Sequence, residues 1–198
     1  MKKEPRTATV ERSTKETRIS CRLVVDGGGD VHIDTGIGFL DHLLTALAFH
    51  AGWDLALECT GDLEVDDHHT AEDCALALGD AVRSAAGERR GLARFGWAFA
   101  PLDEALARAV VDLSGRPWPE VNLGLERERL GGLAAENVAH VLRSFAIALG
   151  AAVHVDVERG ANDHHRAEAA FKALALALRQ ALARAEHGRI PSTKGVLA

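Results

Sequence analysis

The chain has 198 residues, 47% of them hydrophobic, and carries a formal net charge of −6. A chain of this length fits one ordinary domain or two small fused halves, and it can bury a core without disulfides. The acidic balance, without a clustered run of lysine and arginine, argues against nucleic acid or an anionic membrane surface as the partner.

The cysteine count and the hydropathy pattern indicate where in the cell the protein is expected. Cys21, Cys59 and Cys74 are odd in number and form no CxxC pair, so the sequence predicts neither a disulfide framework nor a thiolate zinc site. The first residues contain no apolar core of a secretory signal, and the least polar uncharged stretch, 145–155, is too short to span a bilayer. We therefore expect a cytoplasmic protein.

The first half predicts short strands followed by a helix. Alternation predicts strands at 7–12 and 17–25, and the glycine-rich segment 26–30 predicts a hairpin turn into a third strand at 31–34. Apolar residues at helical spacing predict a helix over 39–51.

A further strand and a long helix complete this half. The strand is predicted at 54–60 and the helix at 68–86, with Asp66 or Asp67 as its cap. The tract 87–91 is the expected joint between the halves, which gives the boundaries 1–90 and 91–198.

The second half repeats this order. Strands are predicted at 96–100, 105–113 and 152–158, with helices at 136–149 and from Asp163, again as a cap, to about Ala185. The sequence therefore predicts an α+β fold of two duplicated halves, each a small β-sheet covered by two α-helices, with the helices packed between the sheets. The three tryptophans are assigned to packing: Trp53, Trp97 and Trp118.

Each half also carries one copy of a histidine motif. His68-His69-Thr70-Ala71-Glu72 and His164-His165-Arg166-Ala167-Glu168 follow His42 and His140 by 26 and 24 residues. On a helix the glutamate lies beneath both histidines, so the three side chains can converge on a cation. The repetition predicts two metal sites with the ligands His42, His68, His69, Glu72, His140, His164, His165 and Glu168.

The grouping of these ligands stays open in the sequence. One partition places His42, His69 and Glu72 with a histidine of the second pair, and the mirror set with one of the first. Ligands from adjacent subunits are an alternative. A purely structural role for the ions is disfavoured because the set is duplicated and contains no cysteine.

Segments throughout the chain match a known family. They lie at residues 12–17, 36–42, 60–73, 94–96, 101–105, 112–117, 162–172 and 191–197. With them the chain resembles the imidazoleglycerol-phosphate dehydratases of histidine biosynthesis, in the stand-alone form. The resemblance implies removal of water from D-erythro-imidazole glycerol phosphate to give imidazole acetol phosphate. It also implies two Mn²⁺ per active site and a homo-oligomer of 24 subunits with metal sites at subunit interfaces.

The resemblance suggests a mechanism and its residues. Cations on both ring nitrogens would stabilise an imidazolate, which expels the hydroxyl group as a diazafulvene forms, and Glu16 is the candidate base. The resemblance implies that the substrate's phosphate is bound by Arg94, Arg116, Ser192 and Lys194, with Lys172 beside them. The whole substrate-binding set is Glu16, His42, His50, His68, His69, Glu72, Arg94, Arg116, His164, His165, Glu168, Lys172, Ser192 and Lys194.

Several roles remain open. His50 matches a family histidine near the pocket, although a packing role explains it equally well, and Asp103 and Glu104 lie in a matching segment without an evident role. A dinuclear phosphoesterase and a metal-dependent assembly or storage protein are the competing functions, because paired ions also activate water and can join subunits.

Overall fold

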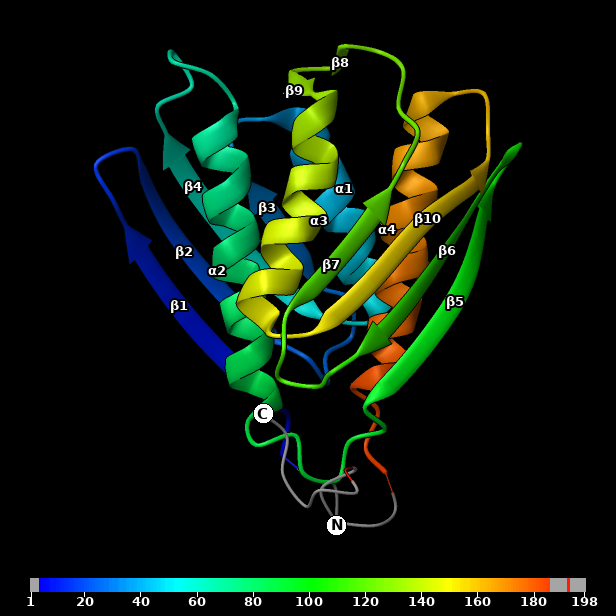
Figure 1. The fold of residues 1–198 in the computed structure, drawn as a ribbon. Coiled ribbons are helices and arrows are strands. Elements are labelled where there is room, and N and C mark those ends of the chain that lie inside the picture. The colour runs from blue at the N-terminus through cyan, green and yellow to red at the C-terminus, as the bar shows by residue number, and fades with distance from the viewer. Residues whose placement is uncertain (1–3, 186–191, 193–198) are drawn as a thin grey trace.

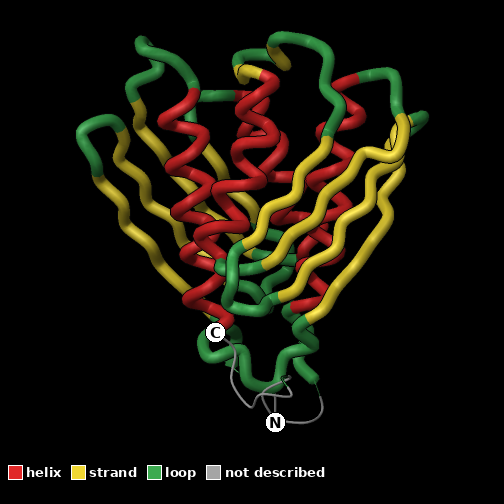
Figure 2. Tube along the Cα trace, in the orientation of Figure 1, coloured by secondary structure: helices red, strands yellow, loops and turns green. Residues whose placement is uncertain are grey.

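Two four-stranded sheets face each other across four helices in the computed structural model, which describes residues 4–185 and Ser192 (Figure 1). The helices form the inner layer and the sheets the two outer layers (Figure 2). Strand residues alternate between buried and exposed, as in β2 (Thr17–Val24), so each sheet turns one apolar face to the helices. The predicted α+β fold of two duplicated halves is confirmed.

The first sheet has the strand order β1-β2-β4-β3. Its other strands are β1 (Thr7–Ser13), β3 (Val31–Asp34) and β4 (Asp54–Gly61). The predicted hairpin over residues 26–30 is wrong, because β4 lies between β2 and β3 and pairs with β3 in parallel. The loop is instead organised by Asp54, whose Oδ1 accepts backbone N–H groups from Gly28, Gly29 and Asp30.

The second sheet repeats this topology with the order β5-β6-β10-β7. Its strands are β5 (Phe95–Leu102), β6 (Ala105–Asp112), β7 (Trp118–Asn122) and β10 (Ala152–Arg159). The sequence analysis missed β7, a short strand with Pro119 and with Val121 as its one fully buried residue. It also missed the two-residue strands β8 (Arg129–Leu130) and β9 (Leu133–Ala134), which are too short to show a period.

All four helices begin at the same end of the sandwich (Figure 1). They are α1 (Gly38–Ala51), α2 (His68–Ala86), α3 (Ala135–Leu149) and α4 (Asp163–Ala181). Gly52 and Gly150 end α1 and α3 in the left-handed conformation, with φ of 76° and 67°. Helix α4 ends before the predicted Ala185, because the chain there pairs with residues 91–93.

The helices pair across the halves, α1 with α4 and α2 with α3. Small residues permit the close approach of α2 and α3. A Cβ atom at Gly79 would lie 2.6 Å from the carbonyl oxygen of Phe145 and 2.7 Å from the Cβ of Ala148. Each pair therefore combines one helix from the first half with one from the second.

The tryptophans divide between core and surface. Trp53 is 1% exposed and packs in the core as predicted. The packing role is wrong for Trp97 and Trp118, which are 63% and 64% exposed. Both lie on the outer face of the second sheet, where Phe95 and Phe99 are also exposed. The outer face of the first sheet carries mostly polar and charged residues instead.

Asp26 joins the start of the chain to the end of α4. Its Oδ1 lies 2.6 Å from Arg6 Nη2, and its Oδ2 lies 2.8 Å from Arg184 Nη2. Arg6 also donates to the carbonyl of Leu182. The Arg6 hydrogen bond, together with that from Arg184, lowers the pKa of the Asp26 carboxyl despite its partial burial.

We expect Asp26→Asn to lower the free energy of unfolding by about 1 kcal/mol at pH 7, because the carboxylate is only partly shielded from water. A lowered pKa means that the contribution is present above the unfolded-state pKa of about 3.9 and is lost as pH falls below it. Denaturant unfolding between pH 7 and pH 3 measures the difference between variant and wild type. Asp30→Asn, which removes an exposed carboxylate from the same loop, is the control. A difference that stays constant down to pH 3 would contradict the ion-pair account.

Candidate metal centres

The first cluster of potential ligands lies where α1 meets α4. His42 comes from α1, and His164 and Glu168 come from α4. Glu168 Oε2 lies 2.9 Å from His42 Nε2 and 3.1 Å from His164 Nε2. The three ligand atoms lie within 4.8 Å of one another, so one ion can contact all three.

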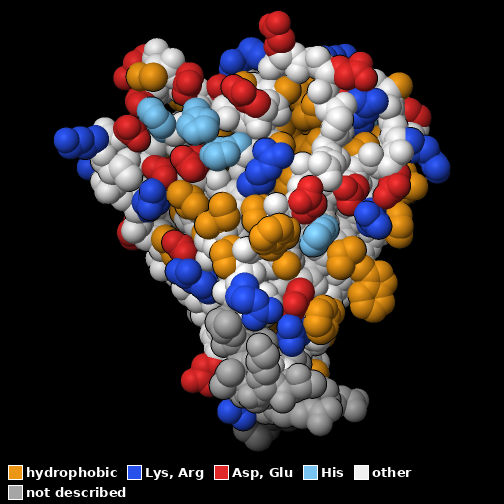
Figure 3. All heavy atoms as spheres, viewed as in Figure 1, with side chains coloured by type: hydrophobic (Ala, Val, Ile, Leu, Met, Phe, Trp, Pro, Cys, Tyr) orange, Lys and Arg blue, Asp and Glu red, His pale blue; other side chains and the backbone are white. Residues whose placement is uncertain are grey.

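The second cluster lies where α2 meets α3. His68 and Glu72 come from α2 and His140 from α3, and their ligand atoms also lie within 4.8 Å of one another. Glu72 lies 3.8 Å from His68 Nε2 and 3.3 Å from His140 Nε2, and the two imidazole rings stack at 4.7 Å. Histidine and acidic side chains gather over the starts of these helices (Figure 3).

The clusters correct the predicted partition within one chain. His42 joins Glu168 rather than Glu72, and His140 joins Glu72 rather than Glu168. The reason is the packing of the helices, because α1 contacts α4 and α3 contacts α2. The one partition named from the sequence placed each upstream histidine with the motif of its own half, while the grouping itself was left open.

The second histidine of each pair, His69 or His165, lies outside the two clusters found among the described residues, and we call these two the outward histidines. The rings of His68 and His69 stand at 78°, and those of His164 and His165 at 89°. Residues four apart on a helix are separated by about 40° of rotation, whereas those three apart diverge by about 60° in the opposite sense. In the described part of a single chain, each motif therefore contributes its first histidine and its glutamate to a cluster.

Carboxylates hold both outward histidines by Nδ1. His69 Nδ1 lies 3.0 Å from Asp62 Oδ2, and His165 Nδ1 lies 2.7 Å from Glu104 Oε2. These hydrogen bonds raise the pKa of each histidine. The pKa of Glu104 falls to about 2, through His165 and then through the backbone N–H of Asn162. Each Nε2 is left for another partner.

Glu16 and Asp103 lie at equivalent places beside these nitrogens. Glu16, in the β1–β2 turn, has Oε1 at 3.8 Å from His69 Nε2. Asp103, in the β5–β6 turn, has Oδ2 at 3.8 Å from His165 Nε2. The predicted base is thus close to an outward histidine.

Lys172 lies beside the first cluster. Its Nζ lies 2.7 Å from Glu168 Oε1. Burial opposes ionisation of Glu168, but hydrogen bonds from Lys172 and His42 outweigh it and lower the pKa of this carboxyl to about 2. His50 is close to the same pair, and burial and then the charge of Lys172 lower its pKa. The structure therefore brings Lys172 and His50 near Glu168.

The two clusters differ in what surrounds them. In the second cluster, the amide oxygen of buried Asn137 lies 3.0 Å from His68 Nδ1. In the first cluster, the ring of Phe39 contacts both His42 and His164, with centroids 5.9 and 5.2 Å apart. Asn137 and Phe39 each precede the upstream histidine by three residues. Sequence reasoning missed the roles of Asn137 and Glu104, which contact histidines more than 60 residues away, and that of Asp62, which contacts His69 seven residues along the chain.

The acidic residues predicted as caps have different roles. Asp67 stands at the N-cap position of α2 without a side-chain cap hydrogen bond, and Asp66, the residue before it, accepts the backbone N–H of His68. Asp67 instead accepts the N–H of Ala134, and Asp163 accepts those of Glu126 and Arg127. The cap of α4 is Asn162. Asp67 and Asp163 thus anchor the loop between β7 and α3.

Two of the predicted phosphate contacts, Arg94 and Arg116, lie far from the clusters. Arg94 N–H donates to the carbonyl of Ala181, at the far end of α4 from His164. At about 1.5 Å per residue, these ends are roughly 25 Å apart. Arg94 also forms an ion pair with Asp112 at 2.7 Å.

Arg116 lies at the Arg94 end of the molecule. It is exposed in the connection from β6 to β7, and Leu113 at the start of that connection donates to the carbonyl of Arg94. Ser192 is among the described residues, whereas Lys194 lies outside them. Within one chain, Arg94 and Arg116 cannot contact a small molecule held at either histidine cluster.

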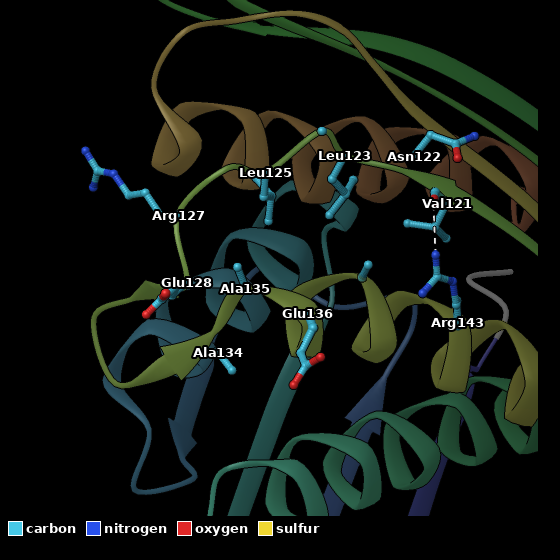
Figure 4. A pocket seen from close by; sticks show the side chains of 12 residues that line it. Val121, Asn122, Leu123, Leu125, Arg127, Glu128, Ala134, Ala135, Glu136 and Arg143 are labelled. Carbon is cyan, nitrogen blue, oxygen red and sulfur yellow. Dashed lines mark hydrogen bonds between the residues drawn. The ribbon is translucent and has the colours of Figure 1, made fainter.

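A separate cavity of about 630 Å³ lies between the segment after β7 and helix α3 (Figure 4). Arg143 crosses it to donate to the carbonyl of Val121 at 3.1 Å. None of the residues lining it belongs to the predicted site. Among the described residues, no helix has the length and apolar character needed to span a membrane.

The donor chemistry suits a first-row divalent ion. Each cluster offers two imidazoles and one carboxylate, and three protein ligands leave positions open on a four- to six-coordinate ion. The imidazoles are partly open to solvent, with 42% and 44% of the His42 and His164 side chains exposed. Further ligands can therefore approach each cluster from outside the chain.

Comparison with known proteins decides the family. A sequence profile described as imidazoleglycerol-phosphate dehydratase matches residues 35–178. The chain belongs to the imidazoleglycerol-phosphate dehydratase family. It is 54% identical to the enzyme of that name from Candida glabrata, over 96% of this chain and 100% of that protein. It is 57% identical to the enzyme from Phaffia rhodozyma, over 97% of this chain and 96% of that protein.

Solved structures of the family agree with the fold. The Staphylococcus aureus enzyme matches with a TM-score of 0.81 and 36% identity, over 90% of this chain and 99% of that one. The Pyrococcus furiosus enzyme, solved in complex with (S)-C348, matches with a TM-score of 0.81 and 39% identity, over 95% of this chain and 100% of that one. Dehydratases of this name are hydro-lyases, enzymes that remove water from their substrate.

We expect Gly79→Ala to destabilise the protein by about 1–3 kcal/mol, because the added methyl group overlaps α3. It should also weaken metal binding, since α2 and α3 supply the two sides of one cluster. Thermal unfolding and titration with Mn²⁺ measure the two effects. Gly38→Ala is the control, because its Cβ would meet nothing within 4 Å. Unchanged stability in Gly79→Ala would show that the close contact of α2 with α3 is not needed.

Proposed function

We propose that this chain removes water from D-erythro-imidazole glycerol phosphate to give imidazole acetol phosphate. The observation that carries the proposal is the pair of matched histidine and glutamate clusters at one end of the helices. Two such sites suit a ring with two nitrogens, because each nitrogen can take one ion. Membership of the family supports the same substrate.

We propose two Mn²⁺ per active site, held by His42, His164 and Glu168 and by His68, Glu72 and His140. The outward His69 and His165 would complete the ligand sets of other copies. Ions held there would supply positive charge at both ring nitrogens, which favours the imidazolate form and, after loss of the hydroxyl group, a diazafulvene.

The remaining chemistry falls to side chains of the protein. Glu16 would remove the proton from the carbon next to the one that loses its hydroxyl group, and the resulting enol becomes the ketone. Its side chain is half exposed and lies beside His69, so it can reach a substrate bound at that histidine. Arg94, Arg116, Ser192 and Lys194 would bind the phosphate, and Lys172 and His50 would lie near the ring.

A complete site then needs several copies of the chain. Arg94 and the histidine clusters stand at opposite ends of α4, and the outward histidines join no cluster among the described residues of their own chain. We propose a homo-oligomer of 24 subunits with metal sites at the subunit interfaces. The exposed aromatic residues on the second sheet support burial against another copy. The free thiols support a reducing compartment, the cytoplasm.

The direct test incubates the manganese-loaded protein with imidazole glycerol phosphate. We expect formation of the ketone. Release of inorganic phosphate would instead indicate a phosphoesterase, and no reaction with intact metal-dependent assembly would indicate a storage or assembly role.

Glu16→Gln tests the proposed base. We expect turnover to fall by about 10²-fold or more while metal content stays near that of the wild type, because the amide cannot accept the proton. Glu11→Gln, on the same hairpin, is the control and should retain turnover. Retained turnover in Glu16→Gln would remove Glu16 from this role.

Coexpression of two inactive variants tests the shared site. Arg116→Ala removes a phosphate contact and His165→Ala removes an outward ligand, so each assembly alone should be inactive. In mixed assemblies, some sites receive an intact Arg116 from one chain and an intact His165 from another, and activity should return. Mixed assemblies that stay inactive, with both chains present by differential tags, would argue for sites built within one chain.

A further inference from the structure

Glu104 occupies a rigid position between a hairpin and a helix. It lies in the two-residue turn between β5 and β6, where Asp103 adopts a positive φ of 46°. Its Oε1 accepts the backbone N–H groups of Ala161 and Asn162 at 3.1 and 2.8 Å. Its Oε2 faces His165 Nδ1 at 2.7 Å. The two carboxylate oxygens therefore have separate, fixed partners.

We propose that Glu104 is a positioning residue that fixes the tautomer of His165 and thereby presents its Nε2 lone pair to a metal ion. This inference rests on the proposed function, in which His165 is a metal ligand. Sequence analysis assigned no role to Glu104.

The chemistry of the two groups dictates the tautomer. An ionised carboxylate only accepts hydrogen bonds, so Nδ1 must carry the proton. In a neutral imidazole the other nitrogen is then unprotonated and free to bind a metal. A carboxylate partner also fixes the ring orientation and makes the ligand nitrogen more basic.

Asp62 is the counterpart of Glu104 in the first half, but it is held differently. Both of its oxygens face His69 Nδ1, at 3.3 and 3.0 Å. Neither oxygen accepts a backbone N–H group in the part of the chain that the structure describes. The Asp62 side chain can therefore exchange its two oxygen positions, whereas Glu104 cannot.

This difference predicts opposite responses to amide substitution. In Glu104→Gln, the amide oxygen must stay with the two backbone donors, so the NH₂ group faces His165 Nδ1. That group donates, which moves the imidazole proton to Nε2 and blocks the metal-binding lone pair. In Asp62→Asn, the amide can turn its oxygen toward His69 and preserve the tautomer.

The experiment titrates Mn²⁺ into metal-free protein against a fluorescent chelator. We expect Glu104→Ala to lose about tenfold in affinity and Glu104→Gln about a hundredfold. Asp62→Asn should stay close to the wild type. Thermal unfolding of each metal-free variant establishes that it is folded, and light scattering follows metal-dependent assembly as a second readout.

A merely structural role predicts the reverse order. If Glu104 only anchored residues 161–162, Glu104→Gln would retain the acceptor and bind metal better than Glu104→Ala. That order, or wild-type affinity in folded Glu104→Ala, would overturn the proposal. His165→Ala tests separately whether His165 is a metal ligand, which the positioning role of Glu104 requires. If His165→Ala binds Mn²⁺ as tightly as the wild type, His165 is not a ligand, and its place in the proposed function fails. If His165→Ala loses affinity while Glu104→Gln binds as tightly as the wild type, only the positioning role of Glu104 is refuted.

Discussion

The pairing of helices from opposite halves is the constraint on which the candidate site depends. Within residues 4–185, neither half contains a complete cluster, because the upstream histidine of each half meets the motif of the other. Contact of α2 with α3, close enough to exclude a side chain at Gly79, keeps one cluster together, and contact of α1 with α4 keeps the other. Folding of the sandwich core and assembly of the clusters are therefore the same event.

Local periodicity in the sequence was enough to predict most of the helices and strands. The remaining features depend on packing between distant segments. The sequence predicted the four helices and most strands, because alternation and helical spacing are local. It failed for β7, with one fully buried residue, and for the order of β2, β3 and β4, which depends on long-range pairing. The ligand types were predictable from the repeated motif. Their grouping was not, because the partner of α1 is set by the shape of the buried helix faces.

Duplication preserved the ligands while their surroundings diverged. Asn137 in one cluster and Phe39 in the other stand at equivalent positions, one accepting a hydrogen bond and one packing an aromatic ring. An amide acceptor fixes the tautomer of His68, whereas Phe39 only restricts the ring of His164. The two clusters therefore need not bind metal with equal affinity, although their ligand sets are identical.

The separation of Arg94 from the clusters within one chain gives a chemical reason for the proposed assembly. An anion-binding arginine next to a cluster would repel the cation that the cluster must bind, and the length of α4 keeps Arg94 about 25 Å away. Lys172 lies beside the first cluster, and its charge is neutralised by Glu168 at 2.7 Å. A substrate with a ring at one end and a phosphate at the other can meet both groups only where copies of the chain abut. In the proposed assembly an isolated chain could not complete the reaction, and the chemistry would be confined to the assembled protein.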